Sequence, residues 1–454
     1  MTALRSLIGI VCVMVAAVCP LEAQEAPGPT PLFRGLFGGA EPLGARDQVF
    51  DFTASLFSSY VDEIETGDVE PLPGDWFQGG SATLNFQKNW DRASLGAFAG
   101  AGVSYVDSLR EAGEDPWLER WGVGARGSYS RPIARRTDFG VDGSVSYSPY
   151  FSFGMDGGIG GGFGQIGGGF ASGPDRVQGV PGLDYTVDRS PNVRSNGSAA
   201  LVHNLTNRSS LEAFYGIQHL DFIDNVEGYL DRVTQRAGGR FRYRINEWVG
   251  ARAGYTYRWS LWGDGEPTIN HDIDVGVDGG YGREFQIARR TTFSFDTRSG
   301  VFVSDSFQDA ETLDPRTRLF IGGTAALAHR WGRSWQADVR YDRSASYVDG
   351  LAEPVFSNRA SATLRGVPLR RLDFIATAAY SHGDVGFTRS ENGFATATAT
   401  AQLRAALARN LAAFAQYFYY HYDFEQGVVL PGGVPRQLDR QGASFGLTYW
   451  LPLW

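Results

Sequence analysis

Apolar and polar residues alternate at every second position through most of this chain, in segments of roughly 10–15 residues separated by breaks. The clearest segment is 394–403, where alanines at most odd positions interleave with threonines and a glutamine at most even positions. An α-helix would mix these two sets around its circumference, whereas a β-strand places them on opposite faces. The alternation therefore predicts strands with one apolar and one polar face.

These segments are about twice as long as the strands of soluble β-propellers and sandwiches, the main alternative folds, which average about 5–6 residues. An even number of long antiparallel strands is typical of bacterial outer-membrane barrels. The predicted fold class is therefore all-β, a transmembrane antiparallel up-and-down β-barrel of about 18 (16–18) strands. The strands are expected near residues 47–60, 77–88, 93–105, 120–130, 138–149, 195–205, 211–221, 233–245, 248–259, 272–285, 291–303, 317–330, 335–343, 357–366, 372–382, 394–407, 412–422 and 440–451.

The breaks alternate between short and long ones, which is a second sign of such a barrel. Short breaks such as 206–209 and 288–290 carry arginines, and long breaks such as 61–74, 106–118 and 150–194 carry Asp and Glu. Aromatic residues make up 13% of the chain, and many Trp and Tyr lie near predicted strand ends, where a barrel has its interfacial girdles. We therefore expect short periplasmic turns, long extracellular loops and both termini in the periplasm.

Residues 1–23 form a predicted cleaved signal peptide, with Arg5 ahead of an apolar stretch and Ala23 at the cleavage site. A lipoprotein signal that uses Cys19 is the alternative. Because Cys12 and Cys19 are the two cysteines of the chain, cleavage would leave a protein without disulfides or thiolate metal sites.

The rest of the chain divides into a Pro- and Gly-rich segment at 24–45, predicted to be flexible and periplasmic, and the barrel at 46–454. No apolar run of about 18 or more residues follows the first 20 residues, which excludes a helical membrane protein. The net charge of −9 argues against a nucleic-acid binder.

The last predicted strand ends on an aromatic residue, Trp454, and resembles the C-terminal signal by which the barrel-assembly machinery recognises outer-membrane barrels; Pro452 departs from the usual pattern. Over 46–454 the chain also resembles the β-barrel porin families associated with exopolysaccharide export, through Arg- and Tyr-flanked hairpins such as RYRINEWVGARAGYTYRW at 242–259. This resemblance implies a porin-like channel in the Gram-negative outer membrane, in contact with membrane lipid and lipopolysaccharide. It also implies periplasmic polysaccharide-export components as partners.

Charged residues recur on the polar face of three neighbouring predicted strands. If the hairpin folds about Glu247, Arg242 faces Arg252 and Arg236 faces Arg258. Like charges in opposition cost stability unless acids, water or a passing anion compensate them. We interpret this face as a pore lining that attracts anionic or hydroxyl-rich solutes, and the alternative is a set of wall-stiffening salt bridges. The candidate pore-lining residues are Arg236, Arg240, Arg242, Arg244, Arg252, Arg258, Asp274 and Asp278.

The longest break, 150–194, joins the fifth and sixth predicted strands and is rich in glycine. In general porins the loop at this place in strand order folds inward and narrows the channel. By resemblance we predict a constriction loop here, and the alternative is a mobile external loop. Its candidate residues are Asp156, Asp175, Arg176, Asp184, Asp188 and Arg189.

The sequence gives little sign of catalysis. The six histidines are scattered without metal-ligand spacing, and no Gly-x-Ser-x-Gly motif occurs, so we predict no catalytic residue, metal or cofactor. A rim-site hydrolase using His382 and Asp384, or Ca²⁺ held near Asp264 and Glu266, is a minor alternative. We expect a passive, water-filled channel for small hydrophilic solutes or exported polysaccharide; the main alternative is a non-conducting structural or adhesive barrel.

Overall fold

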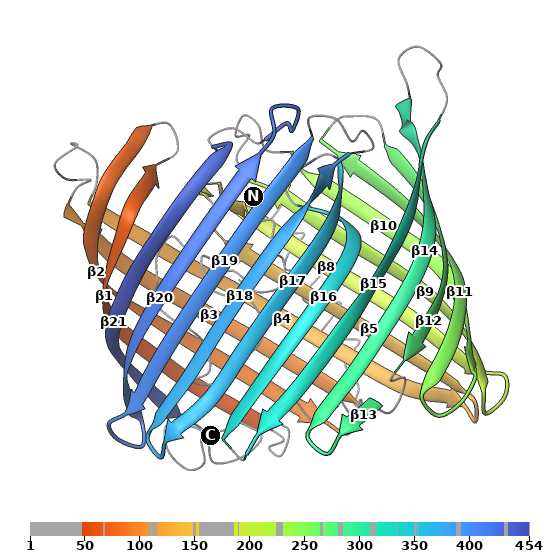
Figure 1. The fold of residues 1–454 in the computed structure, drawn as a ribbon, viewed down its shortest axis with the longest axis horizontal. Helices are drawn as coiled ribbons and strands as arrows, with labels where there is room; N and C mark the ends of the chain where they lie inside the picture. Colours follow the sequence, from red (N-terminus) through yellow and green to blue (C-terminus); the bar gives the residue numbers. More distant parts are fainter. Residues whose placement is uncertain are drawn as a thin grey trace.

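The computed structural model describes residues 48–66, 69–107, 110, 116–148, 151–153, 186–188, 190–223, 230–263, 267–279, 285–308, 315–332, 334–348, 351, 353–386, 392–430 and 435–453. Nearly all of these residues are in β-strands, and the strands run around one barrel (Figure 1). The predicted signal peptide, the segment 24–45 and Trp454 lie outside the described residues.

Eighteen antiparallel strands form the wall, each paired with its neighbours in chain order. The wall closes where β1 (Gln48–Thr66) pairs with β21 (Gln437–Pro452). β12 (Thr268–Gly279) and β13 (Phe285–Ala288) together fill one position, because both pair with β14 (Thr291–Gln308). The other wall strands are β2 (Val69–Trp90), β3 (Ala93–Val106), β4 (Trp117–Ala134), β5 (Thr137–Ser148), β8 (Asn192–Asn204), β9 (Ser209–Phe222), β10 (Arg232–Arg244), β11 (Val249–Trp262), β15 (Pro315–Trp331), β16 (Trp335–Tyr347), β17 (Pro354–Leu369), β18 (Leu372–Val385), β19 (Gly393–Ala406) and β20 (Leu411–Phe424).

The predicted fold class is confirmed, and a strand lies at each predicted segment. One predicted loop, 61–74, is wrong, because β1 and β2 continue their ladder to Thr66 and Val69. This extension lies beyond the residues that pair with β21 and β3, so its outer edges are not part of the wall. Pro71 and Pro73, which made the segment resemble a loop, are tolerated on such an edge because their missing N–H groups break no wall hydrogen bond.

Alternation along each strand sets the two faces of the wall. In β19, Thr396 and Thr398 turn inward and are buried, while the intervening alanines face outward. Inward hydroxyl groups bond across neighbouring strands, as Ser55 does with Thr448 at 3.0 Å. The polar face therefore lies inside the barrel, away from lipid.

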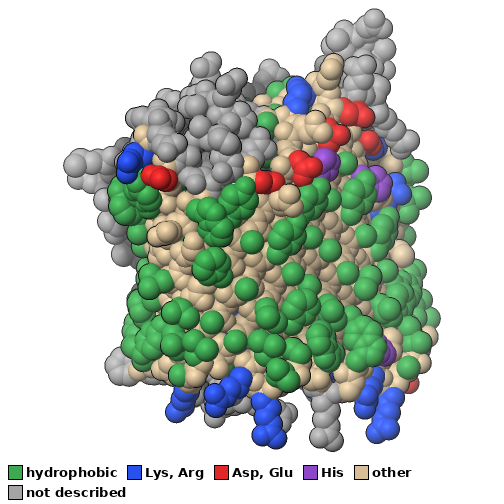
Figure 2. All heavy atoms as spheres, turned by 60° about the vertical axis from the view of Figure 1, so that its left-hand side comes forward, with side chains coloured by type: hydrophobic (Ala, Val, Ile, Leu, Met, Phe, Trp, Pro, Cys, Tyr) green, Lys and Arg blue, Asp and Glu red, His purple; other side chains and the backbone are tan. Residues whose placement is uncertain are grey.

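The face in Figure 2 carries a broad band of hydrophobic side chains, with a row of Lys and Arg along the lower rim and most of the Asp, Glu and His side chains near the upper rim. Aromatic pairs flank this band, such as Trp121–Tyr147 with ring centroids 5.0 Å apart and Trp248–Phe285 at 5.7 Å. Rings at both edges are the girdles of a transmembrane barrel. Among the described residues, no helix has the length and apolarity to cross a membrane.

A buried apolar cluster, here called the mouth cluster, occupies the inner face at the long-loop end. It joins residues from strands that are far apart in the barrel, including Val61 of β1, Leu220 of β9 and Phe418 of β20. Leu351, between β16 and β17, and Val428, after β20, pack in the same cluster and are almost fully buried. Residues of two connecting segments therefore turn inward at this end of the barrel. The complete cluster comprises Val61, Phe77, Val106, Leu220, Phe222, Leu351, Val355, Val385, Phe394, Phe418, Tyr420, Tyr422, Phe424, Val428 and Leu438.

The lipid-facing band predicts that the cost of a charge depends on its depth. Val275 faces outward between the girdles, and Ile287 faces outward beside the short turn after β13. We expect Val275→Arg to lower the free energy of unfolding by about 2–4 kcal/mol and Ile287→Arg by about 0–1 kcal/mol, because only the first places a cation in hydrocarbon. Denaturant titration of the protein folded into lipid vesicles would measure both, and equal costs would contradict this placement of the band.

Candidate functional site

The candidate site is a charged stripe on the inner wall, built on the β10–β11 hairpin. The register predicted about Glu247 is confirmed: Arg242 lies opposite Arg252, and Arg236 opposite Arg258. The intervening side chains, such as Phe241 and Tyr243, are exposed on the outer face. The hairpin therefore brings four arginines together in two opposed pairs on its inward face.

An acid that the sequence analysis missed partly compensates these pairs. Glu212 of β9 lies directly opposite Arg240. Its Oε2 atom is 3.3 Å from Nη2 of Arg242 and 3.7 Å from Nη1 of Arg240. Glu212 is a single acid between Leu211 and Ala213, so its neighbours in sequence give no sign of its partners. Only the register between β9 and β10 places it beside the arginines.

Asp274 of β12 compensates the stripe from its other side. Its Oδ2 atom is 3.1 Å from Nε of Arg252 and 3.8 Å from Nε of Arg240. The side chains of Arg252 and Asp274 are only 11% and 13% exposed, so this ion pair is screened little by water. Asp274 therefore links the two arginine-bearing strands electrostatically.

Arg252 also reaches a second carboxylate that the sequence analysis missed, Asp296 of β14. Both terminal nitrogens donate to it, with Nη2 2.7 Å from Oδ1 and Nη1 bonded to Oδ2. The position opposite Arg252 on β12 is Gly276, which has no side chain to block the path to β14. A fork of this kind is the strongest geometry for an arginine–carboxylate pair.

The result is a network of alternating sign across β9 to β14: Glu212, Arg240, Asp274, Arg252 and Asp296, with Arg242 joined to Glu212. The paired arginines thus fit the wall-stiffening alternative. Arg236 and Arg244 also face inward and are exposed; Arg244 lies at the short-turn end of β10, and Arg236 lies nearer its long-loop end. Arg236 lies along the wall over Gly216, the residue opposite it on β9.

The remaining predicted residues fall into two groups. Arg258 and Asp278 are half-buried on the inner faces of β11 and β12, and Asp278 lies against Gly250 and opposite Asp296. Asp188 ends β7 (Thr186–Asp188), which pairs with β6 (Phe151–Phe153) and lies close to β1. The other constriction-loop candidates lie outside the described residues: Asp156, Asp175, Arg176, Asp184 and Arg189. Within the described part of the chain, no three His, Cys, Asp or Glu residues are arranged to hold a metal ion.

Comparison with known proteins finds similarity in solved structures alone. No protein-family model and no curated protein matches the chain. Acinetobacter baumannii OccAB3 has a TM-score of 0.41 and 13% identity, over 90% of this chain and 100% of its own. Pseudomonas aeruginosa OpdQ has 0.39 and 11%, over 90% and 98%. Pseudomonas aeruginosa OccK2 (OpdF), solved with glucuronate, has 0.40 and 12%, over 90% and 99%. The similarity concerns the barrel fold alone.

The network predicts that removing its shared acid destabilises the wall. Asp274→Asn removes the charge that Arg240 and Arg252 both contact, and we expect the free energy of unfolding to fall by about 1–3 kcal/mol. Asp278→Asn is the matched control on the same strand, with an expected change below about 1 kcal/mol. Denaturant unfolding in vesicles would compare them, and an Asp274→Asn protein as stable as the control would contradict the network's structural role.

Proposed function

We propose that this protein is a passive outer-membrane channel for small hydrophilic solutes, with a preference for anions. The observation that carries the proposal is the inner face of β10 and β11, where arginines recur and the two strand sequences contain no Asp or Glu. The flanking acids engage Arg240, Arg242 and Arg252, while Arg236 and Arg244 are exposed on the inner wall. Exposed cations on a pore wall raise the local concentration of anions.

The distribution of burial supports a path along this side of the interior. On the opposite side of the barrel, the inward polar residues Asp51 and Thr53 of β1 and Gln416 of β20 are almost fully buried. Water therefore has better access to Arg236 and Arg244 than to these residues of β1 and β20. Solutes in this proposal pass along the stripe, in contact with Arg236, Arg244, Arg258 and Asp278.

The cellular setting belongs to the same proposal. The protein would reach the Gram-negative outer membrane through cleavage of residues 1–23 and would be assembled through recognition of its last strand. Exported polysaccharide is the second cargo, suggested by the family resemblance, and periplasmic export components would then be partners. The constriction loop 150–194 would set the size limit. The proposal includes no catalytic step and no cofactor.

Charge reversal at an exposed lining residue tests the channel. Reversing one charge at about 4–8 Å from a passing ion changes its energy by about 1–2 kcal/mol in water, less with salt screening. We expect Arg236→Glu to lower the anion-to-cation permeability ratio by a factor on the order of 2–5. The measurement is the reversal potential of single channels under a KCl gradient in a planar bilayer.

Arg236→Lys, which keeps the charge, is the control and should retain the wild-type permeability ratio. Discrete conductance steps whose selectivity is identical in all three proteins would reject the role of Arg236. The complete absence of steps from a correctly folded wild-type barrel would reject the channel.

The second candidate function, a non-conducting structural or adhesive barrel, is favoured by the mouth cluster. Leu351 and Val428 pack with inward apolar residues of β1, β9 and β20 at the long-loop end. If this packing seals the interior, the wild-type protein should not conduct. Leu351→Asp should then produce conductance, because a buried carboxylate disfavours the packed arrangement.

Planar-bilayer recordings of Leu351→Asp beside the wild type would decide between the two functions. Wild-type conductance that Leu351→Asp leaves unchanged would reject the sealed barrel. Val429→Asp, at a neighbouring exposed position, is the control for the added charge.

A further inference from the structure

The extracellular end of the β14–β15 hairpin separates from the wall. β15 pairs with β16 only as far as Gly323 opposite Arg343. Beyond this level β16 continues to pair with β17 up to Tyr347 opposite Pro354, and β15 continues to pair with β14. Glycines allow the close approach at the branch point, since a Cβ atom on Gly323 would lie 2.3 Å from the carbonyl oxygen of Asp296.

The separated end of β15 lies over the outer surface of its neighbours. Phe320 packs against Phe356 of β17, with ring centroids 5.7 Å apart, and against Ala345 of β16. Alternation places Phe356 and Ala345 on the same face as Tyr341, which is exposed on the outside of the barrel. The hairpin therefore overhangs the outer wall.

Arg318 fixes this overhang. Its guanidinium lies 3.9 Å from the ring centroid of Phe356, and it donates to Oδ2 of Asp384 at 2.6 Å and to the carbonyl oxygen of Gly386 at 2.9 Å. The arginine is largely buried and its charge is matched by Asp384. Asp384 is thus held in a structural ion pair.

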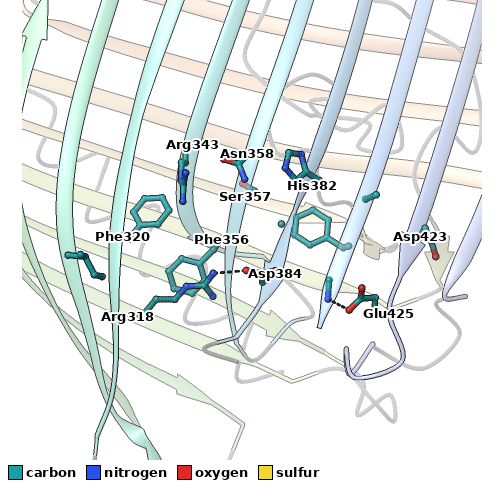
Figure 3. A pocket seen from close by; sticks show the side chains of 15 residues that line it. Arg318, Phe320, Arg343, Phe356, Ser357, Asn358, His382, Asp384, Asp423 and Glu425 are labelled. Atoms are coloured by element: carbon teal, nitrogen blue, oxygen red, sulfur yellow. Dashed lines mark hydrogen bonds and ion pairs between the residues drawn. The ribbon is translucent and has the colours of Figure 1, made fainter. Parts of the chain in front are cut away.

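Between the overhang and the wall lies a groove of about 480 Å³ (Figure 3). Polar residues of strands β16 to β20 line it. Arg343, Asn358, His382 and Asp423 lie in register with one another across these strands, and Glu425 lies two residues beyond Asp423. Arg343 lies at one end of this line, His382 in the middle, two strands from Arg343, and the two acids at the other end. All except Asn358 are exposed, so they are accessible to a ligand.

The depth of the groove follows from its neighbours. Tyr341 lies two residues before Arg343, and Tyr380 two residues before His382, so both are on the same outer face but closer to the hydrophobic band. Both are exposed at the position of the extracellular aromatic girdle. Tyr341 donates to Asn358 at 3.1 Å, and the rings of Tyr380 and His382 are 5.6 Å apart. The groove therefore lies at headgroup level of the outer leaflet, on the lipid side of the wall.

We propose that this groove binds the phosphorylated sugar headgroup of an outer-leaflet glycolipid of the lipopolysaccharide class. The Arg343 guanidinium and the His382 imidazole would donate hydrogen bonds to a phosphate, as basic pockets on membrane proteins do for lipid headgroups. Asp423 and Glu425 would accept hydrogen bonds from sugar hydroxyl groups. Below the groove the outer face presents Val339 and exposed alanines of β17, a smooth apolar surface for the acyl chains.

Two observations make this ligand fit better than others. The groove faces lipid, so a solute in the lumen cannot reach it. No metal-binding arrangement of three or more His, Asp or Glu residues exists in the described part of the chain, so the acids are assigned to direct hydrogen bonding. The proposal depends on the transmembrane placement of the barrel and is independent of whether the barrel conducts.

Binding of purified bis-phosphorylated lipid A to the full-length barrel in detergent tests the proposal, with the dissociation constant measured by native mass spectrometry. We expect Arg343→Glu to weaken binding about tenfold or more, because a charge-assisted contact becomes a repulsion. Arg370→Glu makes the same charge change in an exposed turn at the opposite rim and should leave the dissociation constant unchanged. Equal binding by the wild type and Arg343→Glu would overturn the proposal.

Three further arms identify the ligand. Lipid A without phosphates should bind the wild type as weakly as lipid A binds Arg343→Glu, and equal affinity for both lipids would overturn the phosphate contact. Excess inorganic phosphate should not displace lipid A, and displacement would indicate a site for free phosphate instead. His382→Ala, at an exposed position, should weaken binding measurably in a barrel that keeps its heat-modifiable mobility, which separates loss of contact from loss of fold.

Discussion

The closure of the wall between β1 and β21 is the interaction on which the rest of the structure depends. Hydrocarbon cannot satisfy an unpaired N–H or C=O group, so each wall strand must pair on both sides through the membrane. The ladder from Asp51 opposite Pro452 to Val61 opposite Gly442 supplies the last set of bonds. Closure then fixes an inside and an outside, and the two-residue period of each strand assigns its side chains to one or the other.

On the inside, the same ladder forces side chains of neighbouring strands together, whatever their charge. Arg242 and Arg252 are opposed because the hairpin turns about Glu247, and their repulsion has to be offset by other strands. Glu212, Asp274 and Asp296 supply that offset from three strands. The electrostatics of the inner wall are therefore a property of the assembled barrel, shared across strands that lie up to about eighty residues apart in the chain.

This explains how much of the molecule could be predicted from sequence. Strand positions and the Glu247 register depend on local periodicity, which the chain displays directly. The partners Glu212 and Asp296 could not be predicted, because their contacts depend on register between strands that no local pattern specifies. The mouth cluster was missed for a different reason: β20 has apolar residues on both faces, so Phe418 and Tyr420 carry no signal that they point inward. The hairpin extension was missed because Pro71 and Pro73 resemble loop residues. Proline interrupts a strand only where a backbone N–H is needed for pairing, and this part of β2 has no partner on its outer edge.

The two faces of one strand can serve two functions because the wall is a single layer. On β17, Asn358 turns outward into the groove and Arg359 turns inward, and the two are adjacent in sequence. A substitution on one face leaves the register intact as long as the backbone ladder is kept, since the ladder itself uses no side chain. Changes in the lumen and changes in the headgroup-level groove can therefore accumulate independently on the same strands. The overhang of β15 is the exception, because Arg318 spans from its own strand to β18 and couples the geometry of both.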